Sequence, residues 1–365
     1  MDYKRLGDYI REVNLRNREL RVTNLLGLSI EKKFIPSIAN TIGTDMSAYK
    51  IVHPSQFAYV PVTSRNGEKI TVALYDGEES AIISQAYTIF EIVDQDVLLP
   101  EYLMMWFRRP EFDRYARFHS HGSAREVFDW DELCEVRLPV PTLARQREIV
   151  SEYETLTRRI RLNEQMIAKL EETAQALYRK MFVDCSDKEN LPEGWRRGTI
   201  GEFCDIITGK KDVNESLTEG KYRFFSCSPD AYYSNEFIAK GPAALIAGNG
   251  SYTGRVTYYD KEFDLYQRTY ACIPKKGFME MMSFIYCVLK FQFQNKFMGG
   301  SRGSSIPYIV RGDIADFEFA FEENTSKSFS KGVFNLLTNT QLKIVENEIL
   351  TELQKILLSR MIKTI

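Results

Sequence analysis

The sequence is poor in the residues from which reactive sites are usually built. Its 365 residues include only three histidines, and its six cysteines contain no Cys-x-x-Cys pair. So few histidines argue against a histidine-based proton relay. The cysteine spacing argues against a zinc ribbon or a thioredoxin-like motif. We interpret the cysteines as reduced thiols, which favours a cytoplasmic protein.

An excess of charge of either sign is missing, and so are long apolar runs. The chain carries 48 basic and 50 acidic side chains, so its bulk charge of −2 indicates no nucleic-acid partner. The longest apolar stretches, such as residues 279–289, are too short to span a bilayer. Residues 1–20 are too charged for a signal peptide. We expect a soluble protein that does not contact a membrane.

Motifs of several enzyme classes are missing as well. No Pro-Pro pair occurs, which excludes the Asn/Asp-Pro-Pro-aromatic pocket of a stand-alone adenine methyltransferase. The GxxxxGK[ST] motif of a translocating motor does not occur either. The glycines of residues 248–254 precede residues 255–259, whose pattern is that of a strand, so a dinucleotide-binding loop is not favoured. We expect a chain that is non-catalytic by itself and holds no metal or cofactor.

The two halves of the chain resemble each other. Residues 6–9 (Leu-Gly-Asp-Tyr) resemble residues 200–203 (Ile-Gly-Glu-Phe), and the leucines and methionine of residues 156–181 recur about 180 positions later. Each half begins with short strands and turns, such as residues 69–75 and 254–259, which are rich in β-branched and aromatic side chains. This shared order indicates an internal repeat.

The first helical region has a coiled-coil pattern. Residues 149–181 contain no glycine or proline, and apolar residues recur at alternating steps of four and three, interrupted at Asn163. At about 1.5 Å per residue the helix is about 50 Å long, so we interpret it as a spacer between domains. Asn163 either fixes the register by pairing with a polar side chain or is a tolerated polar residue. The predicted seam consists of Ile149, Tyr153, Leu156, Ile160, Asn163, Ile167, Leu170, Ala174, Leu177 and Met181.

A broader apolar stripe predicts a second long helix over residues 331–365. A coiled-coil seam needs a partner, and this second helix is the candidate that the sequence offers. We therefore predict an α+β fold of two mixed, strand-rich domains joined by two long antiparallel, coiled-coil-like helices with approximate two-fold symmetry. The predicted boundaries are 1–142 and 187–322 for the globular domains, and 143–186 and 323–365 for the helical spacers.

Two domains on a rigid spacer suit a target with two separated parts, such as double-stranded DNA. Residues 1–142 carry four more acidic than basic side chains and residues 191–322 carry equal numbers, yet each domain has a local basic stretch, within 108–125 and 290–311. Both stretches run into Gly-Ser segments, whose backbone N–H groups suit phosphate contacts. A solvated surface is the alternative interpretation of such stretches.

Polar turns provide a second set of candidates. Arg, Asn and Gln side chains can read base edges through paired hydrogen bonds, although hairpin chemistry alone also explains an Asn-Gly turn. The candidate DNA-binding residues from both sets are Ser64, Arg65, Asn66, Gln85, Arg108, Arg109, Arg114, Arg117, Arg125, Lys210, Lys211, Asn249, Tyr252, Arg255, Gln267, Arg268, Lys296, Arg302 and Arg311.

Four segments carry a family resemblance over essentially the whole chain. They are residues 138–150 (LPVPTLARQREIV), 177–182 (LYRKMF), 191–195 (LPEGW) and 200–210 (IGEFCDIITGK). Their order and spacing resemble those of the specificity subunits of type I restriction–modification systems. Residues 317–322 depart from the family pattern, because they lack the Pro-rich motif and its following Gln.

The resemblance implies a division of labour within a larger complex. Each target-recognition domain, 1–142 or 187–322, would read one half of a bipartite DNA site. The helices would set the spacer between the halves and dock two methyltransferase (modification) subunits. Restriction subunits with translocase activity would complete the complex, and S-adenosylmethionine, Mg²⁺ and ATP would belong to these partners.

A second class of function fits the same composition. A duplicated, non-catalytic ligand- or protein-binding scaffold on a coiled coil would also have aromatic-rich polar loops and little net charge. DNA affinity that falls steeply with salt would support a DNA reader, because phosphate contacts release counterions. Salt-insensitive binding of a glycan or a peptide would support the scaffold.

Overall fold

The chain folds into two compact units. The computed structural model describes residues 3–37, 43–64, 67, 69–122, 125–184, 191–230, 232–298 and 306–361. Unit 1 comprises Met1–Ile160 and Glu348–Ile365, and unit 2 comprises Arg161–Asn347. Unit 1 is therefore built from two separate parts of the sequence, whereas unit 2 is continuous.

A four-stranded antiparallel sheet with the order β2-β9-β6-β7 forms the centre of unit 1. Its strands are β2 (Ile10–Val13), β9 (Thr88–Ile92), β6 (Phe57–Tyr59) and β7 (Val72–Leu74). Three antiparallel strand pairs accompany it. They are β1 (Tyr3–Arg5) with β10 (Arg137–Pro139), β3 (Leu26–Leu28) with β4 (Phe34–Pro36), and β5 (Lys50–Val52) with β8 (Ala81–Ile83).

Short helices cover one face of this sheet. They are α1 (Pro100–Phe107), α2 (Pro110–Phe118) and α3 (Trp130–Glu135). Unit 1 also contains the single turns η1 (Leu6–Asp8) and η2 (Met46–Ala48). Proline starts both α1 and α2, where its missing N–H and fixed φ suit a first turn. The Asp129 carboxylate caps α3 by accepting from Glu132 N at 2.9 Å.

Unit 2 has a corresponding central sheet with the order β12-β19-β16-β17. Its antiparallel strands are β12 (Cys204–Thr208), β19 (Thr269–Pro274), β16 (Ala243–Ala247) and β17 (Val256–Tyr259). A second, mixed sheet contains β14 (Tyr232–Ser234), β13 (Tyr222–Phe225), β18 (Glu262–Leu265) and β15 (Ala239–Lys240). Strand β11 (Arg196–Thr199) pairs with β20 (Glu318–Phe321).

The helices of unit 2 are mostly short. They are α5 (Ile200–Phe203), α6 (Met282–Val288), α7 (Gln294–Phe297) and α8 (Arg311–Ala315), with η4 (Val213–Glu215), η5 (Met279–Met281) and the π-helical turns η3 (Arg179–Val183) and η6 (Leu289–Phe293).

The two units repeat one plan. In each, the first strand pairs with the last short strand, and a helical turn leads into the central sheet. Counted along the chain, the strands of both central sheets stand in the order first, fourth, second, third. Short helices and a long helix then follow in both. The internal repeat predicted from the sequence is confirmed by this shared topology.

Each central sheet is buried on both faces, because successive side chains of a strand alternate between faces. In β6, Phe57 and Tyr59 pack with the helices, whereas Ala58 packs with the smaller cluster that contains β5 and β8 side chains. In β16, Ile246 packs with the helices, whereas Leu245 packs with the smaller cluster that contains β18 side chains. All five residues of β16 are buried, which explains its uninterrupted apolar sequence.

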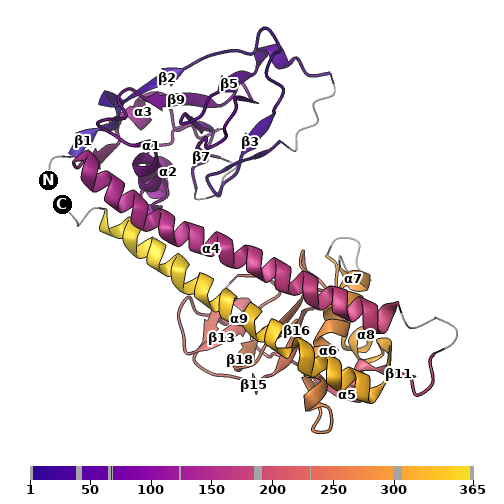
Figure 1. Cartoon of the computed structure of the whole chain (residues 1–365). Coiled ribbons are helices and arrows are strands. Elements are labelled where there is room, and N and C mark those ends of the chain that lie inside the picture. The colour runs from indigo at the N-terminus through magenta and orange to yellow at the C-terminus, as the bar shows by residue number, and fades with distance from the viewer. Residues whose placement is uncertain are drawn as a thin grey trace. The chain divides into compact units, whose positions relative to one another are not determined.

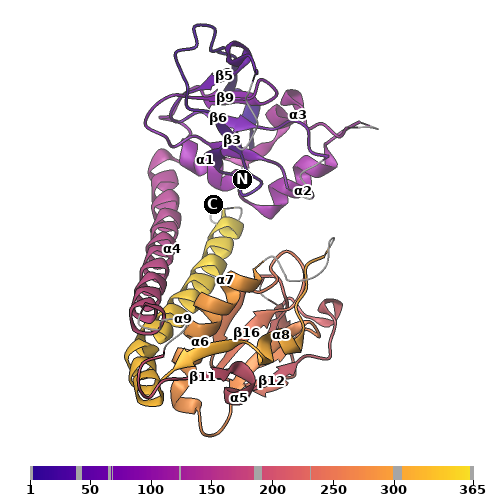
Figure 2. The same cartoon turned by 90° about the vertical axis from the view of Figure 1, so that its right-hand side faces the viewer.

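The long helices α4 (Leu143–Tyr178) and α9 (Glu323–Arg360) lie side by side (Figures 1 and 2). In unit 1, Gln354 Nε2 donates to Thr157 Oγ1 at 2.7 Å, and in unit 2, Asn163 Nδ2 donates to Asn347 Oδ1 at 2.8 Å. Residues later in α4 therefore meet residues earlier in α9, so the helices run antiparallel. The predicted α+β fold with two long packed helices is confirmed.

Helix α9 begins eight residues earlier than the sequence predicts. The Glu322 side chain accepts from Asn324 N at 3.0 Å and from Thr325 N at 2.6 Å, which satisfies N–H groups of the first turn. Ser326 and Ser330 are buried in this part of the helix. Two of the three buried side chains of residues 323–330 are small and polar, so these residues show little of an apolar stripe in the sequence.

Of the predicted seam of α4, Ile149, Tyr153, Asn163 and Ala174 are buried, whereas Leu177 is exposed. Asn163 is fully buried and has the polar partner that register pairing requires. Near the end, Leu177 is 40% exposed and Tyr178 is only 1% exposed. A helix has 3.6 residues per turn, so a 3.5-residue seam drifts around it. Tyr178 replaces Leu177 because it packs against Phe182 in the unit 2 core.

No helix within the described ranges is long and apolar enough to cross a membrane.

Candidate nucleic-acid interface

One edge of each central sheet carries the polar turns singled out in the sequence. In unit 1, β2 and β6 end and β7 and β9 begin there, because Val13 pairs with Ile89 and Tyr59 pairs with Val72 and Thr88. The equivalent strands of unit 2 have the same directions. We call this the loop edge. It comprises residues 14–17, 60–64, 69–71 and 84–87 in unit 1, and 209–211, 248–255 and 266–268 in unit 2.

Backbone hydrogen bonds join the loops of the unit 2 loop edge. Gln267 N donates to Lys211 O at 3.0 Å, and Gly248 N donates to Arg268 O at 2.9 Å. A Cβ atom on Gly248 would lie only 2.3 Å from Arg268 O, so this approach requires glycine. The loops are therefore held in one arrangement before any ligand binds.

In unit 2, Pro307 and Tyr308, near the end of the basic stretch, join this loop edge. Pro307 O accepts from Gly250 N at 3.1 Å and from Thr253 Oγ1 at 3.0 Å. Asn249 forms a β-bridge with Tyr308. The end of the basic stretch therefore lies beside the β16–β17 loop.

The same arrangement occurs in unit 1. Thr63 N donates to Glu126 O at 2.9 Å, and Val62 forms a β-bridge with Val127. Thr63 Oγ1 also donates to Ser120 Oγ at 3.1 Å. In both units, then, the end of the predicted basic stretch meets the loop between the second and third central strands.

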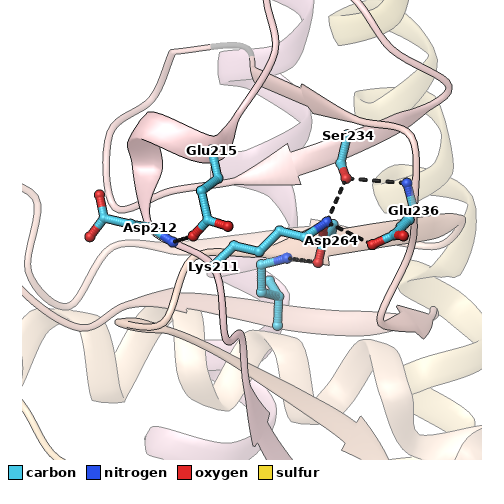
Figure 3. Close-up of polar contacts among 7 residues, drawn as sticks. Lys211, Asp212, Glu215, Ser234, Glu236 and Asp264 are labelled. Atoms are coloured by element: carbon cyan, nitrogen blue, oxygen red, sulfur yellow. Dashed lines mark hydrogen bonds and ion pairs between the residues drawn. The ribbon is translucent and has the colours of Figure 1, made fainter.

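Lys211 is held by carboxylates of its own unit (Figure 3). Its Nζ lies 2.7 Å from Asp264 Oδ2 and 3.2 Å from Glu236 Oε2, and it donates to Ser234 Oγ at 3.1 Å. The hydrogen bond to Asp264 is the main cause of a raised pKa of Lys211. A contact between Lys211 and a phosphate would first have to break these ion pairs, so the lysine serves chiefly to fix the loop.

Two further candidates of unit 2 also have internal partners. Arg255 Nη2 donates to Ser228 O at 2.8 Å, and the Arg255 guanidinium lies 5.6 Å from the Tyr252 ring centre. Burial lowers the pKa of Arg255. Gln267 Nε2 donates to Asp212 Oδ2 at 3.1 Å. These side chains shape the loop edge and leave less hydrogen-bonding capacity for a ligand.

The other candidate residues of the unit 2 loop edge are at least partly exposed. Lys210 and Arg268 are exposed, Tyr252 is 45% exposed, and Asn249 is half-buried. Two cations and an aromatic ring thus lie on loops that the backbone already joins.

On the unit 1 loop edge, Ser64 and Gln85 are exposed. Gln85 Oε1 accepts from Arg16 Nη1 at 3.3 Å. Arg117 Nη1 donates to Gly67 O at 2.7 Å, which brings α2 to the β6–β7 loop. The candidates Arg65, Asn66 and Arg302 lie outside the described residues.

Arg108 and Arg109 have different surroundings. Arg108 lines a cavity of about 240 Å³ between α1 and α4, and its guanidinium lies 5.7 Å from the Tyr153 ring centre. Arg109 is 2% exposed and lies 4.2 Å from the Trp106 ring centre. Burial lowers the pKa of Arg109. Arg109 is therefore a core residue in this structure, which corrects the expectation of a surface phosphate contact.

The remaining candidates lie on short helices or beside them. Arg114, Arg125, Lys296 and Arg311 are all exposed. Lys296 lines a polar cavity of about 550 Å³ together with Asp313, Asp316 and Glu318.

Sequence reasoning missed two residues of the loop edges. Arg16 follows β2 and donates to Ala48 O at 2.6 Å as well as to Gln85. Tyr308 is 40% exposed and bridges Asn249. The repeat itself held the signal for Arg16, because the offset of 194 that joins Leu6 to Ile200 also joins Arg16 to Lys210.

Among the residues that the structure describes, no group of three or more His, Cys, Asp or Glu side chains is placed to hold a metal ion. The loop edges instead combine backbone-fixed turns, exposed cations and aromatic rings. This combination suits a polyanion with readable base edges better than a small substrate.

Comparisons with known proteins agree on one family. A family model described as the type I restriction modification DNA specificity domain matches residues 192–321, which contain unit 2 from β11 to β20. The type I restriction enzyme EcoDI specificity subunit of Escherichia coli is 36% identical over 130 residues, which cover 36% of this chain and 28% of that protein. The HindI specificity subunit of Haemophilus influenzae is 24% identical over 259 residues, which cover 67% of this chain and 54% of that protein.

The matched part thus spans about a quarter and about half of these two relatives. A solved structure resembles the fold over nearly the whole chain. It is the S subunit of a type I restriction–modification system from M. genitalium, with a TM-score of 0.64, 15% identity, and coverage of 99% of this chain and 95% of that chain.

Proposed function

We propose, from its similarity to type I restriction–modification specificity subunits, that this chain gives such a system its DNA sequence specificity. Each globular domain, 1–142 or 187–322, reads one half of a bipartite DNA site. The helices α4 and α9 set the spacing between the two halves. The chain itself is not a catalyst, and the chemistry on DNA is carried out by partner subunits.

One observation carries this proposal: the loop edge is built twice. The bond from Thr63 N to Glu126 O in unit 1 corresponds to the bond from Gly250 N to Pro307 O in unit 2. Evolutionary duplication of a whole binding surface suits a ligand with two similar parts, and two half-sites of a duplex are such a ligand.

The proposed partners are two methyltransferase subunits, together with restriction subunits that translocate DNA. S-adenosylmethionine, Mg²⁺ and ATP are bound by these partners. A feature of unit 1 supports docking on the helices. Leu353 and Ile356 of α9 are 43% and 45% exposed, and with Leu156 of α4 they line an open groove of about 520 Å³. Exposed apolar side chains at helical spacing are typical of a surface that receives a further helix.

A domain exchange tests the proposal. The full chain, with residues 1–142 replaced by those of another specificity subunit, is produced in cells with its methyltransferase subunits, and the methylated sequences are read from genomic DNA. We expect one half of the methylated site to change and the other half to stay. The matched control exchanges residues 187–322 and should change the other half. A change in both halves, or in neither, would contradict the proposal.

A further inference from the structure

Three large side chains with apolar surface are exposed on two joined segments of unit 2. Tyr252 is 45% exposed, Tyr308 is 40% exposed and Ile306 is 63% exposed. The bonds from Gly250 N and Thr253 Oγ1 to Pro307 O hold their two segments together, although these segments lie far apart in the sequence. Apolar area left in water forgoes the stabilisation that its burial would give. Such exposure is explained if a ligand covers these side chains.

This surface is rigidly built. Gly254 has a φ of +87°, and a Cβ atom there would lie 2.7 Å from Phe297 O, so the β16–β17 loop packs closely against α7. Ile309 N donates to Gly248 O at 2.9 Å on the other side of the loop. Side chains on such a support are pre-organised and lose little entropy when they bind.

The polar side chains around this surface are largely used within unit 2. Lys211 is paired with Asp264, and Arg255 Nη2 donates to Ser228 O. The exposed cations Lys210 and Arg268 suit DNA phosphates, which position a protein but carry no sequence information. Hydrogen bonds from these cations or from Asn249 leave the three apolar side chains unused, and these side chains suit contact with an apolar feature of a base.

We propose that Tyr252, Ile306 and Tyr308 select a thymine by contact with its C5 methyl group. This thymine lies in the half of the DNA site that unit 2 reads, here called the second half-site. This methyl group is the apolar feature that the major groove offers. The proposal rests on the proposed function and adds the base class that unit 2 reads. The residues of unit 1 that lie 181 positions before Ile306 and Tyr308 are Arg125 and Val127. Unit 1 therefore presents different side chains to its half of the DNA site.

Uracil replaces thymine in a DNA duplex without any change except the loss of this methyl group. The full chain, assembled with its methyltransferase subunits, is titrated with duplexes of the methylated site in which thymines of one half are replaced by uracil. We expect affinity to fall about fourfold for each contacted methyl group, the effect of about one buried methylene. The half that belongs to unit 2 is known from the domain exchange.

Variants test whether the loss of affinity for uracil-containing duplexes depends on the proposed residues. Tyr252→Ala, Ile306→Ala and Tyr308→Ala together should remove the sensitivity to uracil in the second half-site and leave the first half-site unaffected. Met279→Ala is the matched control, because Met279 is 44% exposed in η5 of the same unit. The inference is overturned if wild type is indifferent to uracil in the second half-site, or if the triple variant stays sensitive. Failure of the proposed function is a different outcome, in which wild type binds the site no more tightly than a scrambled duplex.

Discussion

Each unit contains a lysine–aspartate ion pair with the same N···O distance. In the unit 1 pair the lysine is the more deeply buried residue, whereas in the unit 2 pair it is the aspartate. Lys32 Nζ and Asp113 Oδ1 of unit 1 are 2.7 Å apart, with side chains 6% and 14% exposed. Lys211 Nζ and Asp264 Oδ2 of unit 2 are also 2.7 Å apart, with side chains 27% and 6% exposed. Distance alone therefore does not show which ion depends on its partner. The more deeply buried ion loses more hydration, so it needs the pair more.

The two pairs also hold different parts of the fold. Lys32 lies in the turn between β3 and β4 and donates to Phe107 O as well as to Asp113, which fastens this hairpin to the helices. Lys211 fastens the loop edge of unit 2 to β18. Burial lowers the pKa of Lys32 in spite of Asp113, whereas the hydrogen bond to Asp264 raises the pKa of Lys211.

Single substitutions should cost most at the aspartate of the unit 1 pair and at the lysine of the unit 2 pair, which is the largest effect that we expect. Asp113→Asn leaves the buried Lys32 without its counter-ion, and Lys211→Met leaves the buried Asp264 without one, so each should lower the free energy of unfolding by about 3–5 kcal/mol. Lys32→Met and Asp264→Asn should cost roughly 1–2 kcal/mol, because the ion that remains is the more exposed one. Hydrogen exchange measured separately on each unit gives these values. Equal costs for both members of a pair would contradict this reasoning.

The helix pair offers a smaller test within the same comparison. Asn163 is fully buried where it bonds to Asn347 in unit 2, whereas the bond from Gln354 to Thr157 in unit 1 is exposed. Asn163→Ala should lower the stability of the helix pair by about 1–2 kcal/mol. Gln354→Ala should change it by less than about 0.5 kcal/mol. Urea unfolding followed by circular dichroism measures both. A cost for Gln354→Ala as large as that for Asn163→Ala would show that burial does not separate the two bonds.

The contributions of Lys32 and Lys211 to the free energy of unfolding should change with pH in opposite directions. This is the smallest effect that we expect. The folded-state pKa of Lys32 is below its ordinary value of 10.5, so between these values the unfolded chain binds more protons, and the contribution of Lys32 to stability rises with pH. The folded-state pKa of Lys211 is above 10.5, so its contribution is fully present below 10.5 and is lost as the pH rises through the raised pKa. The measurement is the free energy of unfolding of wild type minus that of Lys32→Met or Lys211→Met, from about pH 8 to about pH 11. Slopes of the same sign would contradict the assignment.

Regular patterns in the sequence predict the repeated plan and the long helix well. The heptad spacing over residues 149–181 predicts most of α4, because an apolar stripe is a local property of a helix. Leu177 of the predicted seam is exposed, because at this turn Tyr178 packs against the side chains of unit 2. A seam computed from the helix alone cannot include the domain against which its last turn packs.

The candidate site was harder to predict, because partners of charged side chains come from distant parts of the chain. Lys211 looks like a free cation in the sequence, but its carboxylate partner Asp264 follows 53 residues later. Arg109 stands in a basic stretch, yet the ring of Trp106 and the core of unit 1 cover it. Charge can be counted from a sequence, whereas its neutralisation depends on the tertiary fold.

Unit 1 is completed by residues near the end of the sequence, and this affects how the chain folds during synthesis. Leu358 and Met361 are 6% and 2% exposed, and they lie in the same core cluster as Ile149 and Tyr153. At roughly 5–20 residues per second, a ribosome needs roughly 10–40 seconds to advance from the end of the first part of unit 1 to these residues. Unit 2 is continuous, and all of its residues are translated before Leu358 and Met361. The part of the protein that is translated first is therefore the part that is completed last.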